Sequence, residues 1–260
     1  GYDVLAKEKE NGRIKRLGFS FHGDKELFKY ILNKRPWDFV LLQINYIDWV
    51  DQEAEFFYNE LVKRGIQCMV MEPLKGGALA SLTPDADAIL KEYAPDKSIA
   101  SWAFRYVGSL PNVLTVLSGM TKMEHLKDNL DTFCDFKPLT DEERVVLDKA
   151  IAEYRRYKQI GCTACKYCMP CPYGIDIPAI LLHYNKCVNA GEVAQSIEDE
   201  NYRKARRAYL VSYDRAVPKL RQADRCIGCN TCVEHCPQRI KIPQELHKIS
   251  NYIENLKREK

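Results

Sequence analysis

The stretch "DFVLLQINYI", from Asp38 to Ile47, decides the fold of the first part of this sequence. It is a continuous apolar run, of the kind expected of a strand that is covered on both faces of a parallel sheet. The segment before it, "KELFKYILNKR", carries apolar residues at helical spacing. The segment after it, "EAEFFYNELVKRG", is predicted as a helix that ends at Gly65. A buried strand between two helices predicts a βα array.

The same alternation continues on either side of that stretch. Further strands are predicted in "IKRLGFSF", "IQCMVMEPL" and "NVLTVLSGM", and further helices in "SIASWAFRYV" and "MEHLKDNLDTF". The residues before the first strand are expected to form a helix that leads into it. Four strands that each precede a helix indicate an α/β fold with a parallel sheet.

Polar and small residues gather at the C-terminal ends of the predicted strands. They are Ser20, His22, Gln43, Asn45, Tyr46, Glu72, Ser118 and Gly119. A (β/α)8 barrel builds its active site at this end of its strands. No G-x-G-x-x-G motif follows the first strand, which argues against half of a Rossmann fold. The array is therefore predicted to be half of a barrel.

Most of the 11 cysteines lie in two short strings, "CTACKYCMPCP" from Cys162 and "CIGCNTCVEHCP" from Cys226. Disulfides between neighbours at two-residue spacing would be strained, so the strings indicate metal ligands in a reducing compartment. Zinc, the alternative metal, usually draws a cysteine pair from each of two separated places, whereas here three cysteines follow one another at that spacing. We predict two [4Fe–4S] clusters, held by Cys162, Cys165, Cys168, Cys171, Cys226, Cys229, Cys232 and Cys236.

The expected ligation is crossed, because a cysteine followed by proline usually serves the other cluster in two-cluster ferredoxins. Cys236 would complete the cluster of the first string, and Cys171 would complete that of the second. The second string has the standard three residues before its last cysteine, but the first string has only Met169 and Pro170. This shorter gap reduces the reach of Cys171 and leaves its assignment open.

Cysteines and cations outside the strings have less specific patterns. We interpret three further cysteines as structural, namely Cys68, Cys134 and Cys187. The polar, helix-prone stretch from Gly191 to Val217 carries a basic cluster of Arg203, Lys204, Arg206 and Arg207. This cluster is either a solvated helix face or a docking surface for an acidic redox partner, which electrostatic steering would favour.

Composition excludes several classes of partner. The chain has 260 residues, of which 46% are hydrophobic and 29% charged, as in a soluble globular protein with a full-sized core. A formal net charge of +3 is too small to indicate nucleic acid or a membrane surface. No apolar run approaches the length of a bilayer span, and Gly1 does not open a signal peptide. We expect a cytoplasmic protein.

The sequence resembles the iron–sulfur branch of the aldo/keto reductase family in five segments taken in order, "GFSFH", "QINY", "MEPLKGG", "LSGMTKMEHLKDNL" and "CTACKYCMPCPYGIDIP". The resemblance implies strands five to eight of a TIM barrel over residues 1–150. A mostly helical, ferredoxin-like domain with two [4Fe–4S] clusters would follow over residues 151–260. It also implies NAD(H) or NADP(H) across the C-terminal mouth of the barrel, and a small carbonyl or alcohol substrate.

The resemblance carries over roles for individual residues. Ser20 and Gln43 would hold the carboxamide of the nicotinamide, while Phe21 replaces the usual asparagine, so one amide contact is missing. Met71 stands where an aromatic side chain normally stacks on the nicotinamide, and can still make a polarisable contact. The other implied cofactor-binding residues are Leu74, Gly76 and Gly77 at the pyrophosphate, Gly119 and Lys122 near a 2′-phosphate, and Asn129 near the adenosine.

Two departures from the family pattern affect the expected chemistry. The cations that grip the 2′-phosphate in NADPH-dependent relatives are replaced by Gly119 and His125, which weakens the case for NADP unless Lys122 compensates. His22 looks like a catalytic histidine, but it follows the strand that would be the fifth, whereas the family's catalytic histidine follows the fourth. We assign His22 a structural or substrate-facing role.

The resemblance places the family's proton-relay residues on the first four strands, so we expect no catalytic residue in this chain. Half of a parallel barrel would expose two open sheet edges. The first half is therefore expected either in the same, longer chain or in another chain. Two hypotheses remain: a nicotinamide-dependent oxidoreductase that passes electrons through its clusters, or an electron-transfer subunit whose half-barrel is a docking scaffold without nucleotide.

Overall fold

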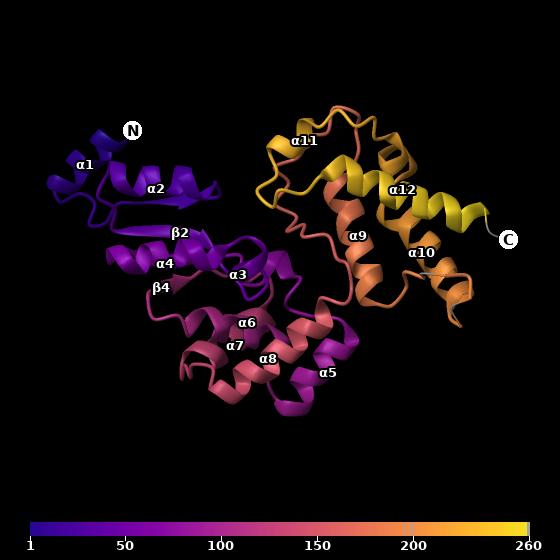
Figure 1. Cartoon of the computed structure of the whole chain (residues 1–260), viewed down its shortest axis with the longest axis horizontal. Helices are drawn as coiled ribbons and strands as arrows, with labels where there is room; N and C mark the ends of the chain where they lie inside the picture. Colours follow the sequence, from indigo (N-terminus) through magenta and orange to yellow (C-terminus); the bar gives the residue numbers. More distant parts are fainter. Residues whose placement is uncertain (195, 199, 259–260) are drawn as a thin grey trace. The chain divides into compact units, whose positions relative to one another are not determined.

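The computed structural model describes residues 1–194, 196–198 and 200–258, and the chain divides into two compact units. Unit 1 comprises Gly1–Lys75 and Tyr93–Leu147. Unit 2 comprises Gly76–Glu92 and Asp148–Lys260. Both units are therefore built from two separate stretches of the chain, which Figure 1 follows from indigo to yellow.

Unit 1 is built on a four-stranded parallel sheet, which confirms the α/β fold predicted from the sequence. Its strands lie side by side in chain order, so that β1 and β4 form the two edges. The strands are β1 (Gly18–Phe21), β2 (Phe39–Gln43), β3 (Gln67–Met71) and β4 (Val113–Val116). Adjacent parallel strands joined by helices follow from the apolar runs and helical spacings of the sequence.

Two helices of unit 1, α2 and α6, begin at side-chain caps, and a third, α4, ends at a glycine cap. The side chain of Asp24 accepts a bond from the amide of Leu27 at 2.8 Å, and that of Ser98 accepts one from Ser101 at 3.0 Å. Gly65 closes α4 in a left-handed conformation with a φ of 65°, as its position predicted. The helices are α1 (Tyr2–Glu10), α2 (Lys25–Lys34), α3 (Asp48–Asp51), α4 (Ala54–Arg64), α6 (Ile99–Gly108), α7 (Met123–Phe133) and the first half of α8 (Asp141–Tyr154).

The core of unit 1 is aromatic at one end of the sheet. The ring of Phe28 on α2 lies 4.8 Å from that of Phe21 and 5.0 Å from that of Phe57 on α4. Val40 and Leu42 of β2 are buried against the same cluster. The other face of β2 is only half-buried, which departs from the two-sided cover predicted for this strand, and Leu114 of the edge strand β4 is 38% exposed.

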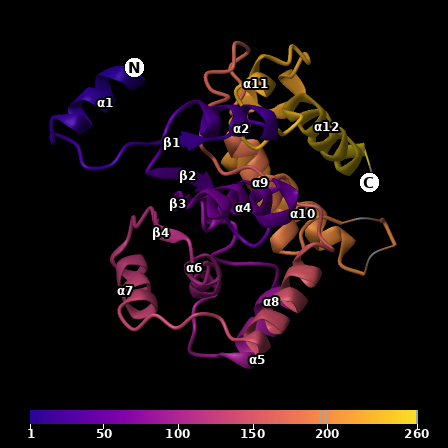
Figure 2. The ribbon, with the colours of Figure 1, turned by 60° about the vertical axis from the view of Figure 1, so that its left-hand side comes forward.

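Unit 2 is mostly helical, in agreement with the ferredoxin-like domain expected from the sequence. Its three long helices are α9 (Ile177–Asn189), α10 (Tyr202–Ala216) and α12 (Ile242–Arg258), whose ribbons Figure 2 shows, and their buried side chains form one apolar core. Tyr209 of α10 sits at its centre, with its ring 5.0 Å from those of His183 and Tyr252. Shorter elements are η1 (Lys75–Gly77), α5 (Pro84–Tyr93), η2 (Lys219–Arg221), η3 (Ala223–Arg225) and α11 (Thr231–Glu234).

Several features of the fold differ from the sequence patterns. The helices α3 and α5 were not predicted, and the helix-prone stretch from Gly191 is helical only from Tyr202 among its described residues. Gln195 and Asp199 of that stretch lie outside the described residues. In the described part of the chain, none of the helices combines the length and the apolar character that crossing a membrane requires.

Candidate functional site

The two cysteine strings of unit 2 are held by hydrogen bonds to its helices. Asn185 of α9 bonds both backbone groups of Ile160, accepting at 2.8 Å and donating at 2.6 Å, just before the first string begins. The hydroxyl of Tyr213 on α10 accepts a bond from the amide of Ala223 at 3.1 Å, just before the second string. The buried core of α9 and α10 therefore fixes where both strings start.

The two strings share one backbone shape although their sequences differ. Ala164 and Lys166, two and four residues after Cys162, have left-handed φ values of 57° and 65°. Gly228 and Asn230, at the same positions after Cys226, have φ values of 75° and 62°. Non-glycine residues seldom adopt this conformation, and strained backbone of this kind concentrates at functional sites. Each string is therefore a loop that turns back between successive cysteines.

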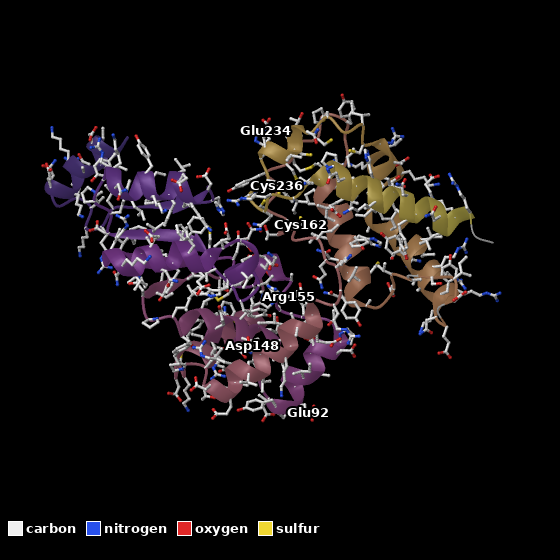
Figure 3. All side chains as sticks on the ribbon, in the orientation of Figure 1. Glu92, Asp148, Arg155, Cys162, Glu234 and Cys236 are labelled. Atoms are coloured by element: carbon white, nitrogen blue, oxygen red, sulfur yellow. The ribbon has the colours of Figure 1, made fainter. Side chains whose placement is uncertain are left out.

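The strings exchange their last cysteines. The thiols of Cys162 and Cys168 interact electrostatically with that of Cys236, and Cys168 also with Cys165. Figure 3 shows Cys162 and Cys236 close together, although they belong to different strings. In the second group, the thiol of Cys232 interacts with its own neighbours in the second string and with Cys171. Each group thus contains the first three thiols of one string and the last thiol of the other string.

Burial disfavours the thiolate form at least at one cysteine of each group. Burial, followed by the neighbouring thiols, raises the pKa of Cys168 to about 12. The same causes raise the pKa of Cys232 to about 11. Bound metal ions are often the largest charges in a site, and they deprotonate a coordinating thiol outright. Four clustered thiols are therefore a donor set that suits a cationic metal core.

A cavity of about 300 Å³ lies between the strings. Its lining includes Cys171, Cys229 and Cys232, three of the four thiols of the second group, together with Cys168 of the first. Within residues 1–194, 196–198 and 200–258, no three His, Cys, Asp or Glu side chains gather tightly around one point where a single metal ion would sit. The soft thiol donors and the cavity fit an iron–sulfur cluster, in which each cysteine binds a different iron.

A second polar cluster lies in unit 1, at the carboxyl end of the sheet. The carboxylate of Asp48 is fully buried and forms an ion pair with Lys75. It also accepts hydrogen bonds from Gln43 at 2.6 Å and from Asn45 at 2.7 Å. Asn45 donates a further bond to the carbonyl of Glu72 at 3.0 Å. This network ties the end of β2 to the segment that follows β3.

Comparison with known protein families bears on both units. Residues 1–152 match the family model described as "Aldo/keto reductase family". The chain belongs to the aldo/keto reductase family. Residues 161–241 match the model of a 4Fe-4S dicluster domain, which covers all eight cysteines of the two strings. This aldo/keto reductase therefore carries an iron–sulfur domain, as the sequence indicated.

Solved aldo/keto reductases resemble part of the chain. A thermostable aldo-keto reductase in complex with the inhibitor epalrestat is 24% identical, with a TM-score of 0.46 over 57% of this chain and 53% of that one. The holo form of an aldo-keto reductase from Bacillus halodurans is 23% identical, with a TM-score of 0.46 over 57% of this chain and 54% of that one. The chain thus spans about half the length of the solved structures it matches. No curated protein matches it.

The structure brings some of the predicted cofactor residues of this aldo/keto reductase together. Gln43 and Met71 pair across β2 and β3, and Asn129 donates a bond to the hydroxyl of Ser118 at 2.9 Å. Gly76 and Gly77 belong to unit 2 instead, where a side chain at Gly76 would collide with the backbone of Thr163. The remaining predicted positions are exposed or half-buried, namely Ser20, Leu74, Gly119 and Lys122, together with His22 and His125.

Sequence reasoning did not find the roles of Asp48 and Lys75. Asp48 directly follows the apolar stretch that ends at Ile47, and Asp38 stands at its other end, but only Asp48 is buried, so this position in the sequence does not by itself reveal a buried carboxylate. Lys75 belongs to the segment "MEPLKGG", to which the family resemblance assigned roles only at Leu74, Gly76 and Gly77. These two residues can pair because β2 and β3 are adjacent in the sheet. No spacing pattern in the sequence shows that adjacency.

Proposed function

We propose that this chain is the cofactor-binding part of an iron–sulfur oxidoreductase of aldo/keto reductase type. In this proposal, residues 1–150 form strands five to eight of a (β/α)8 barrel that binds NAD(H) or NADP(H), and residues 151–260 carry two [4Fe–4S] clusters. The observation that carries the proposal is the exchange of the last cysteines between the strings. Only a two-cluster protein needs Cys236 beside Cys162, and Cys171 beside Cys232.

The proposed ligands of the clusters are the two groups of thiols. Cys162, Cys165, Cys168 and Cys236 would hold one cluster, and Cys171, Cys226, Cys229 and Cys232 the other. When bound, such clusters supply one-electron transfer. The left-handed backbone after the first cysteine of each string turns the loop around its cluster, and the anchors at Asn185 and Tyr213 keep the loops in place.

The edges of the sheet support the half-barrel. Both β1 and β4 are edge strands among the described residues, and a closed barrel has no edges. Beyond β4, the helix α7 carries exposed apolar side chains on one face at helical spacing, namely Met123, Leu126, Leu130 and Phe133. We propose that the other barrel half, in the same chain or another, covers these surfaces and supplies the proton-relay residues.

Nicotinamide binding is proposed at the carboxyl end of the sheet, where Gln43 and Met71 lie side by side. Fluorescence titration with NADH and NADPH tests it, and saturable binding is expected, with NADH bound at least as well because Gly119 and His125 replace the phosphate-binding cations. Gln43→Ala should weaken NADH binding at least tenfold. Gln67→Ala, at the opposite end of β3, is the matched control and should leave it unchanged. No saturable binding by the unaltered chain contradicts this part of the proposal.

The alternative function is an electron-transfer module that binds no nucleotide. Two observations favour it: the amide of Gln43 already donates to the buried Asp48, and Gly76 packs against Thr163 within unit 2. This alternative predicts a full iron content without NADH or NADPH binding.

For the enzyme of the main proposal, the proposed substrate is a small carbonyl or alcohol. Its proposed location is the cytoplasm.

A further inference from the structure

A groove of about 1280 Å³ runs between α9 and α10 in unit 2, outside the cysteine strings. The two helices have 13 and 15 residues, so the groove is bounded by walls roughly 20 Å long. Its lining comes from these helices and from the segment that joins them: Ala179, Leu182, His183, Lys186, Cys187, Ala190, Glu192, Arg203, Lys204, Arg207, Ala208, Val211, Ser212, Arg215 and Ala216.

The floor of the groove is apolar and open to solvent. Leu182 on α9 and Val211 on α10 are 39% and 45% exposed. The small side chains of Ala179, Ala208 and Ala216 leave room between the helices for a guest side chain. Apolar side chains that are exposed together and rimmed by polar residues mark interaction sites.

The polar groups below the floor are satisfied within the protein. His183 and Ser212 form a hydrogen bond of 2.8 Å, and the hydroxyl of Ser212 is 3.1 Å from the carbonyl oxygen of Tyr209, to which it donates. Burial lowers the pKa of His183 and raises the pKa of Cys187 to about 11, so neither is charged at neutral pH. These groups therefore offer a neutral floor, and they supply neither a reactive thiolate nor a metal-binding anion.

The rim of the groove is strongly basic. Among the described residues that line it, five are cations, namely Lys186, Arg203, Lys204, Arg207 and Arg215, and one is a carboxylate, Glu192. In the part of the chain that the structure describes, none of the five forms an ion pair. Arg206, the remaining cation of the basic cluster, has a different role, because its guanidinium donates to the carbonyl of Leu256 at 2.5 Å. The rim cations are therefore free to meet an outside carboxylate.

We propose that this groove docks a small acidic electron-carrier protein, whose carboxylates meet the five rim cations and whose apolar side chain enters between Leu182 and Val211. Unpaired charges of one sign around an apolar centre steer and orient a partner of the opposite sign. The identification of the partner as an electron carrier rests on the proposed function, that this unit holds two clusters. The groove ends at Ala179 and Ala216, the ends of α9 and α10 that lie nearest in sequence to the two strings.

The test uses the whole chain loaded with iron and sulfide, and an acidic plant-type [2Fe–2S] ferredoxin as the probe. Calorimetric titration should show saturable binding that weakens as salt is raised. The pair Arg203→Glu and Arg207→Glu should weaken binding at least tenfold at low salt and flatten the salt dependence. Lys241→Glu with Lys257→Glu changes the net charge equally at exposed positions outside the groove, and should change the affinity less than twofold.

A second pair of variants tests the apolar centre. Leu182→Ser with Val211→Ser should weaken ferredoxin binding at least fivefold without altering its salt dependence, because no charge changes. The docking surface is overturned if the Arg203 and Arg207 variant and the Lys241 and Lys257 variant lose equal ferredoxin affinity. It is also overturned if the Arg203 and Arg207 variant binds ferredoxin with unaltered affinity. Failure of the cluster-loaded chain to bind ferredoxin overturns it as well. A chain that binds ferredoxin but takes up no iron contradicts the proposed function alone.

Discussion

Single residues show how the two cysteine strings reach one shape. Ala164 and Gly228 hold the same position of the loop, and both are left-handed, yet only one of them is glycine. The left-handed conformation costs a non-glycine residue roughly 1–2 kcal/mol. The first string carries this cost twice, at Ala164 and Lys166, whereas the second carries it once, at Asn230. We expect cluster binding to offset that cost, and the first string to depend more on its cluster for its shape.

Paired cysteine substitutions test which thiols share a cluster. In the crossed arrangement, Cys236→Ser alone lowers the iron content from about eight to about four per chain. Adding Cys162→Ser removes a second ligand of the same cluster, so the iron content stays near four. Adding Cys226→Ser instead damages the other cluster as well and takes the iron content toward zero. Iron and acid-labile sulfide analysis of anaerobic protein measures all three variants.

The control for these variants is Cys134→Ser, which changes an exposed cysteine outside both strings and should leave the iron content unchanged. Uncrossed ligation predicts the reverse result for the two double variants. About one zinc per chain, without labile sulfide, would contradict the cluster assignment altogether.

Asp48 supplies a second residue-scale prediction. Asp48→Asn leaves the ammonium of Lys75 buried without its carboxylate, and removing one partner of a buried pair typically costs about 3–5 kcal/mol of unfolding free energy. Adding Lys75→Met removes the unpaired charge and should recover at least half of that loss. Urea unfolding followed by tryptophan fluorescence reports on this unit, because Trp37, Trp49 and Trp102 all lie in unit 1.

The matched control is the exposed pair of Lys137 and Asp135, which also lies in unit 1. Asp135→Asn should change the unfolding free energy by less than about 0.5 kcal/mol, since solvent screens such pairs. If Asp48→Asn lowers the unfolding free energy by less than about 1 kcal/mol, the hydrogen bonds and ion pair of Asp48 do not hold the end of β2 to the segment after β3.

At the scale of elements, one ion pair joins α6 to α8. Arg105 donates two bonds of 2.6 Å to Glu143, and both side chains are nearly buried. The bonds from Arg105 hold the pKa of Glu143 below its ordinary value of 4.5. Because the folded pKa lies below the unfolded one, the pair stabilises the fold fully above pH 4.5, and this stability is lost as the pH falls through the folded pKa.

Glu143→Gln therefore has a pH-dependent effect. At pH 7 the variant should lose about 1–3 kcal/mol of unfolding free energy, the range for hydrogen bonds to charged groups. The difference from the unaltered chain should shrink as the pH is lowered below 4.5 and through the folded pKa. Urea unfolding at several pH values measures it, and a difference that stays constant over this range would show that the carboxylate's charge is not involved.

The elements also show what the sequence could predict. Apolar runs and helical spacing found the four strands and the helices α2, α4, α6 and α7, because each depends on local pattern. The cysteine spacing found both strings for the same reason. The pairing of Asp48 with Lys75, and the α9–α10 groove, depend on packing between segments distant in sequence. Local patterns carry no trace of such packing, so these features appeared only in the structure.

At the scale of the molecule, the proposed half-barrel leaves an apolar helix face open. Leu126 and Leu130 of α7 are 37% and 49% exposed. The chain without its other half should therefore self-associate as its concentration rises. Leu126→Glu with Leu130→Glu should weaken that association at least tenfold in sedimentation equilibrium. Val62→Glu, at a 48% exposed position on α4, is the control and should not change it. An unaltered chain that stays monomeric at all concentrations contradicts the prediction.

The assignment of residues 76–92 to unit 2 has a consequence for biosynthesis. The ribosome makes this segment, with Ala86 and Leu90 that are fully buried in the finished protein, before any other part of unit 2. At 5–20 residues per second, residues 93–147 then take about 3–11 s to emerge. During that time the apolar side chains of α5 have no unit of their own to pack against, and a segment of ten residues is too short to hold a stable helix by itself, so α5 can form only after the rest of unit 2 has been made.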